Sequence, residues 1–250
     1  MTERPSVLVP IRVLEDESLP EGTTELLAKA HVVLLGYHVI PEQTAPGQAR
    51  MQFEDQALSR LDAYEELLVD AGATVDQRLV FTHDAQQTID RQIAEYDCLA
   101  ALVPRALAAV EDVLVAVRGT VGLDRLARVV GGLFADRGID VTLYHVTSED
   151  ESDADVEVLL DGVIDRMDEN GFDTDHVDTR TDRDVKPVDA IADLAETYDV
   201  VVMGESDSSL STFVFGMPAD QVAERFLGPV LVVQREPAAD PEASDADDQP

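Results

Sequence analysis

The chain has 250 residues, which allows one large domain or two small ones, and its hydrophobic content of 45% is enough for a buried core. Asp and Glu total 52 against 18 Lys and Arg, which gives a formal net charge of −34 at pH 7. This balance argues against nucleic acid and anionic membrane surfaces as partners, because both attract basic proteins. The acidic residues are spread along the whole chain, and lysine occurs only twice. We therefore expect a halophile's protein, in which molar salt shortens the screening length to roughly 3 Å.

Membrane and export signals are not expected from this sequence. No apolar run approaches the roughly 18 residues of a membrane-spanning helix. The N-terminal residues lack a basic segment followed by an apolar one, so we expect no signal peptide. Cys98 is the single cysteine, which excludes a disulfide within the chain and fits a reducing cytoplasm. Without a partner thiol, Cys98 is interpreted as a buried structural residue and not as a nucleophile.

Apolar β-branched runs predict strands, and amphipathic runs that end near glycine predict helices. In the first half, strands are predicted over residues 7–11, 31–40, 74–81 and 98–103, and helices over 23–30, 49–71 and 85–95. In the second half, strands are predicted over 113–117, 140–146, 172–179, 200–204 and 229–234, and helices over 123–136, 156–169, 187–197 and 217–226. Alternating strands and helices predict a parallel sheet with right-handed crossovers.

The two halves contain similar segments in the same order. Ser6-Val-Leu-Val-Pro-Ile-Arg12 matches Asp112-Val-Leu-Val-Ala-Val-Arg118, and three further pairs follow. The copies lie about a hundred residues apart, which is too long for a solenoid repeat and fits two duplicated domains. We predict domains at 1–108 and 109–235 and an acidic, disordered tail at 236–250. Only residues 104–111 separate the copies, so the first one lacks the last strand.

Each copy would present an open sheet edge that needs cover, so the copies are expected to pair within the chain as a pseudo-dimer. Two alternatives remain for the unequal first copy. The strand at 230–233 covers an edge for both halves, or a second chain in a homodimer supplies the cover.

The second half closes with Val200-Val-Val-Met-Gly204, a hydroxyl-rich loop, Gly216 and Gly228-Pro-Val-Leu-Val-Val233. Together with Val113-Leu-Val-Ala-Val-Arg-Gly119, these segments resemble the universal stress protein (UspA-like) family, in a haloarchaeal tandem form with a truncated first copy. The resemblance implies an adenine-nucleotide alpha-hydrolase-like fold, an open parallel sheet of strand order 3-2-1-4-5. In such a sheet, ligands bind beyond the carboxyl ends of the strands where the order reverses.

ATP-binding members of this family carry Gly-x2-Gly-x9-Gly-Ser/Thr after the fourth strand and Asp at the end of the first. The cofactor that the resemblance implies is ATP or another adenine nucleotide. The candidate binding residues are then Ala116, Arg118, Gly119, Val146, Met203, Gly204, Ser206 and Gly216.

The sequence departs from the family pattern at several of these positions. Asp207 replaces the second glycine, and Gly216 stands one residue early for the third. Arg12 and Arg118 replace the aspartate; a guanidinium accepts no hydrogen bond from a nucleoside but can bind phosphate. We therefore predict a degenerate nucleotide pocket in the second domain.

The leading hypothesis is a cytoplasmic, non-catalytic stress-response or regulatory protein. The alternatives are a regulatory module of a membrane transporter, and a phosphotransfer or hydrolytic enzyme using the hydroxyl groups of residues 206–212. His38 and His145 are interpreted as equivalent packing or capping residues at the end of the second strand of each copy, because neither has a nearby histidine to complete a metal site.

Overall fold

A computed structural model describes residues 3–15, 18–119, 122–204 and 228–234, and they form one nine-stranded sheet. The strand order is β3-β2-β1-β4-β9-β8-β5-β6-β7, and every neighbouring pair is parallel except β4 and β9. This confirms the predicted α/β class with an open, mostly parallel sheet. The helix expected at 217–226 and the tail at 236–250 lie outside the described residues.

The elements of the first half follow the predicted order. They are β1 (Ser6–Arg12), α1 (Thr23–Leu26), β2 (His31–Val39), α2 (Pro46–Asp70), β3 (Thr74–Thr82), α3 (Ala85–Glu95) and β4 (Ala100–Val103). Helix α1 is a single turn, shorter than the helix expected at 23–30. It begins after Gly22, which has φ +80°, and a Cβ there would lie 2.4 Å from the carbonyl oxygen of Leu107.

In the second half, the described residues form five strands. Its elements are β5 (Asp112–Ala116), α4 (Leu123–Phe134), β6 (Asp140–Thr147), α5 (Asp153–Glu169), a 3-10 turn (Thr174–His176), β7 (Val177–Arg183), α6 (Pro187–Ala195), β8 (Val200–Gly204) and β9 (Val230–Val233). From the β7 edge, these strands lie in the order third, second, first, fourth, fifth, as predicted.

Strand β7 begins five residues later than expected from the sequence. The Asp173 carboxylate accepts a hydrogen bond from the Asp175 backbone N–H at 3.1 Å. Such local side-chain bonds compete with strand pairing, so a 3-10 turn occupies 174–176 and the strand starts at Val177.

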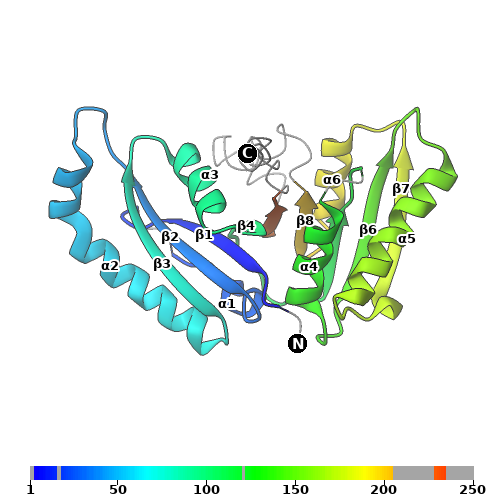
Figure 1. Ribbon diagram of the computed structural model, residues 1–250, viewed down its shortest axis with the longest axis horizontal. Coiled ribbons are helices and arrows are strands. Elements are labelled where there is room, and N and C mark those ends of the chain that lie inside the picture. The colour runs from blue at the N-terminus through cyan, green and yellow to red at the C-terminus, as the bar shows by residue number, and fades with distance from the viewer. Residues whose placement is uncertain (1–2, 16–17, 120–121, 205–227, 235–250) are drawn as a thin grey trace, which may run out of the picture.

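Strand β9 joins the two halves into one sheet. Leu231 is the register partner of Val202 in β8, where pairing is parallel, and of Leu102 in β4, where it is antiparallel. Figure 1 shows this strand as the red-brown arrow between β4 and β8. Of the two alternatives for the open edges, the structure contains the first: residues 230–233 cover an edge for both halves.

The helices of the second half cover opposite faces of the sheet because side chains alternate along each strand. Val113 and Val115 of β5 pack in the core cluster that includes residues of α4 and α5. Leu114 and Ala116 point to the other face, where they pack with Ile191 of α6. Helix α4 also contacts the first half: the buried Arg125 guanidinium donates to the Asp97 carboxylate at 2.8 Å. In the described part of the chain, no helix is both long and apolar enough to span a bilayer.

Candidate functional site

Two of the candidate binding residues are register partners at the carboxyl ends of neighbouring strands. Ala116, the last residue of β5, pairs with Met203 of β8 on one side and with Tyr144 of β6 on the other. All three side chains are buried on the α6 face of the sheet. The expected convergence of these two strand ends is therefore present.

The next candidate residues lie at the same edge. Gly204 follows Met203 and ends β8. Arg118 lies two residues beyond the end of β5 and is half-buried, and Gly119 has φ +65° with open space where a Cβ would be. Parallel strands end at one edge of a sheet, so Arg118 and Gly204 belong to the same strand-end region. Their role in binding stays a prediction, and Ser206, Asp207 and Gly216 lie outside the described residues.

Val146 extends this region toward the edge strand. It is half-buried in β6, packs against the cluster under α6, and has Asp182 of β7 as its register partner. Ala116, Val146 and Met203 thus lie on one face of the sheet, on the neighbouring strands β8, β5 and β6.

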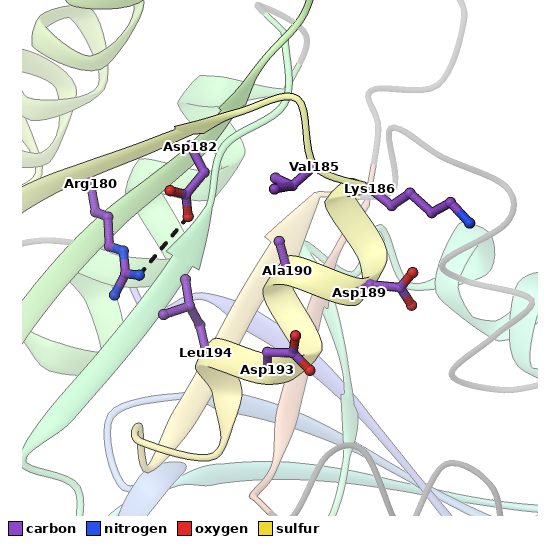
Figure 2. Close-up of a pocket in the computed structure, with 8 residues that line it drawn as sticks. All are labelled: Arg180, Asp182, Val185, Lys186, Asp189, Ala190, Asp193 and Leu194. Atoms are coloured by element: carbon purple, nitrogen blue, oxygen red, sulfur yellow. Dashed lines mark ion pairs between the residues drawn. The ribbon is translucent and has the colours of Figure 1, made fainter.

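A pocket of about 550 Å³ lies beside them, between β7 and α6. Figure 2 shows Arg180 and Asp182 on the strand opposite Ala190 and Leu194 on the helix. Its volume is within the range of small-molecule sites, about 300–1,000 Å³. The residues that line it are Arg180, Asp182, Val185, Lys186, Asp189, Ala190, Asp193 and Leu194.

A buried tyrosine connects this pocket with the strand ends. The Tyr144 hydroxyl donates to Oδ2 of Asp182 at 2.8 Å, and Nη2 of Arg180 lies 3.9 Å from the same oxygen. Burial and the hydrogen bond to Asp182 raise the pKa of Tyr144, so its hydroxyl remains a donor at neutral pH. Because Tyr144 pairs with both Ala116 and Arg180, the pocket and the candidate residues share one row of the sheet.

The comparison with protein families shows to which family this fold belongs. The model of the universal stress protein family matches residues 110–234, which is half of the chain. The chain belongs to the universal stress protein family.

Solved structures of universal stress proteins resemble this one. The protein from Archaeoglobus fulgidus DSM 4304 is 17% identical over 92% of this chain and 96% of its own, with a TM-score of 0.60, which shows a shared fold. A universal stress protein in complex with cAMP is 24% identical over 50% of this chain and 98% of its own, with a TM-score of 0.39. A putative universal stress protein from Pseudomonas aeruginosa UCBPP-PA14 is 17% identical over 94% of both chains, with a TM-score of 0.47. No curated protein matches the chain.

In this universal stress protein, His145 stabilises the end of β5. Its Nδ1 lies 2.9 Å from the Val117 carbonyl oxygen and its Nε2 lies 3.1 Å from the Glu151 carboxylate. The Ser148 backbone N–H and then His145 lower the pKa of Glu151. The interpretation of His145 as a packing or capping residue is confirmed by these contacts.

The proposed equivalence of His38 and His145 is wrong. Pro10 pairs with Leu35, whereas Ala116, at the matching position of β5, pairs with Tyr144. His38 therefore lies three residues beyond the partner of Pro10, and His145 lies one residue beyond the partner of Ala116. His38 instead packs edge-on against Phe53 and Phe81.

Cys98 has the structural environment expected from the sequence. The side chain is 1% exposed, and burial raises the pKa of its thiol to about 12. At neutral pH it is protonated, which makes it a poor nucleophile.

Sequence reasoning missed the pocket residues of β7. Arg180 and Asp182 belong to a polar, exposed strand and resembled ordinary surface residues. The available signal was their spacing: residues two apart on a strand share a face.

Proposed function

We propose that this universal stress protein is a non-catalytic, regulatory stress-response protein that binds a nucleotide at the carboxyl ends of β5 and β8. The observation that carries the proposal is the register pairing of Ala116 with Met203, since Arg118 and Gly204 follow these residues at the same edge of the sheet. A pocket of about 550 Å³ lies further along the sheet, between β7 and α6. The order of strands reverses between β5 and β8, and open α/β sheets bind ligands at such a point.

The chemistry of this edge differs from that of a family ATP site. Arg118 can donate two parallel hydrogen bonds to a phosphate, which the usual aspartate cannot do. The family resemblance favours ATP or another adenine nucleotide as ligand, held in a degenerate pocket with Arg118 directed at phosphate. The bound and free forms would differ in their association with a protein partner.

Two features of the described residues favour binding over turnover. The Cys98 thiol is buried with a raised pKa, and both ring nitrogens of His145 are engaged in the fold. Neither residue is placed as a nucleophile or general base.

The same proposal includes the domain organisation and the cellular environment of the protein. We propose two tandem family domains, at 1–108 and 109–235, followed by the acidic tail at 236–250, and a cytoplasmic protein adapted to high salt. The net charge of −34 and the similar strand orders of the two halves support these assignments.

The test is nucleotide binding by the full-length chain. Absorbance near 260 nm after denaturation detects nucleotide that co-purifies, and calorimetry with ATP in molar KCl measures affinity. Arg118→Ala should weaken ATP binding about tenfold, since one charge-assisted contact contributes about 1.5–3 kcal/mol.

The matched control is Arg128→Ala. Arg128 is also partly exposed, but it lines a separate pocket with Ser6 and Leu99 at the amino ends of β1 and β4. An equal loss in both variants would indicate a general charge effect. If the parent chain binds no adenine nucleotide at millimolar concentration, the proposed nucleotide site is absent.

A further inference from the structure

The β7–α6 pocket is a slot whose β7 side is polar and whose α6 side presents Ala190 and Leu194 together with the charged Asp193. Figure 2 shows Ala190 and Leu194 of α6 facing the strand, whereas Lys186 and Asp189 extend away from it. Val185, which is 44% exposed, also lines the slot. A planar ring placed there would cover apolar surface and keep one edge toward β7.

The polar side has unused hydrogen-bonding capacity. The 3.9 Å separation between Arg180 and Asp182 is too long for a hydrogen bond. In the described part of the chain, the Arg180 guanidinium donates no hydrogen bond, and Oδ1 of Asp182 accepts none. The slot therefore presents a donor group and an acceptor group side by side.

Tyr144 fixes the orientation of the acceptor. Its side chain is 1% exposed, and its hydroxyl holds Oδ2 of Asp182 at 2.8 Å. A polar group held in place by a buried neighbour loses little conformational entropy when a ligand binds. The Asp182 carboxylate is thus arranged for recognition before any ligand arrives.

We propose that this slot binds the base of a purine nucleotide and prefers guanine to adenine. Guanine presents O6 as an acceptor beside two donors, N1–H and the N2 amino group. Arg180 can donate to O6, and the Asp182 carboxylate can accept from both donors. Adenine presents one donor group, the N6 amino group, beside one acceptor, N1. Asp182 can then accept from only one donor group, so one of the contacts made to guanine is missing.

This proposal adds a base preference to the proposed function. It rests on the proposed function for the position of the phosphates. From β7 to β8 there are three strand spacings, about 14 Å in total. An extended nucleoside triphosphate can span this distance, with its base at Arg180 and Asp182 and its phosphates near Arg118 and Gly204.

Calorimetry with free nucleosides tests the slot without the phosphate end. Guanosine and adenosine are titrated into the full-length chain in molar KCl, and tripolyphosphate is titrated separately. Guanosine should bind about tenfold more tightly than adenosine, the discrimination of one well-formed base contact. Asp182→Asn should remove this preference, because one carboxylate oxygen becomes an amide donor. It retains an oxygen that can accept from Tyr144.

Asp193→Asn is the matched control. Asp193 is exposed on α6, on the side of the slot opposite the base edge that Arg180 and Asp182 contact; its substitution removes the same charge, so it should change both nucleoside affinities alike and not their ratio. As a second variant, Ala190→Leu narrows the slot from the helix. It should weaken both nucleosides and leave the affinity for tripolyphosphate unaltered.

The outcomes separate this inference from the proposed function. Equal affinities, a preference for adenosine, or no nucleoside binding at millimolar concentration would overturn the guanine slot. Tripolyphosphate or ATP binding in that case would leave the proposed function standing. A guanosine preference that disappears only in Asp182→Asn would establish the slot even if tripolyphosphate does not bind.

Discussion

Strand β9 should determine the stability of both halves, and Leu231→Ala tests this dependence. Leu231 is fully buried and pairs with Leu102 of β4 and Val202 of β8. Truncation of a buried leucine to alanine costs about 2–5 kcal/mol, from lost transfer free energy and the remaining cavity. We expect a loss of about 3 kcal/mol in the free energy of unfolding, because Leu231 is enclosed between two paired strands.

Urea denaturation in molar KCl, followed by far-ultraviolet circular dichroism, measures this loss. The transition should remain single, because β9 is a strand of both halves and its loss would expose an edge of each. Leu67→Ala is the control: Leu67 is 53% exposed on α2, and its truncation should cost less than about 1 kcal/mol. A loss below about 1 kcal/mol at Leu231, or two separate transitions with the earlier one confined to the second half, would refute the role assigned to β9.

Three further predictions concern charge. The thermal midpoint of unfolding should rise as KCl is increased from dilute to molar, because the net charge of −34 repels itself less when screened; an unchanged midpoint would contradict this. Arg125→Met should lower the free energy of unfolding, measured in urea, by about 2 kcal/mol, because it removes the largely buried guanidinium and its hydrogen bond to Asp97. An unchanged free energy would show that this contact does not hold α4 against the first half. Glu151 has a lowered folded-state pKa, so its contribution to stability is present above the unfolded value of about 4.5 and is lost as pH falls through the folded value. The stability difference between the parent and Glu151→Gln should therefore narrow below pH 4.5, and a constant difference from pH 7 to pH 3 would exclude this linkage.

Much of the fold could be predicted because the central strands are buried on both faces. Runs such as residues 113–117 and 200–204 contain no polar side chain and three valines each, a pattern typical of parallel strands covered by helices. The pairing direction of β9 with β4 could not be read in this way. Val230–Val233 is apolar at every position, so no alternation indicates which neighbour, or which direction, each side of the strand will have.

The sequence predicted the candidate site only for residues whose place at the end of a strand also fixes their place in the sheet. Ala116 and Met203 had to converge because Ala116 ends β5 and Met203 is the last residue but one of β8, and the two strands are neighbours in the expected order. The slot on β7 depends instead on a tertiary contact, the hydrogen bond between Tyr144 and Asp182, which links residues 38 positions apart. Neither residue is unusual in its own segment, so sequence reasoning did not select them.

The two arginines at the ends of β1 and β5 indicate why the proposed site belongs to the second half. Arg12 has Tyr37 as its register partner and donates to the Tyr37 hydroxyl at 3.1 Å, and it also pairs with Glu15. When the register of β5 and β6 is extended by two residues, the position opposite Arg118 is Val146 and not a tyrosine. The first arginine is thus held by its own strand end, in a half whose fourth strand is followed directly by the connection to β5. The second follows β5, whose neighbour β8 ends on Gly204, where a phosphate could approach the backbone. The arginine of the first half therefore holds its own strand end, and the strand end of the second half, which closes on a glycine, is where we propose that phosphate binds.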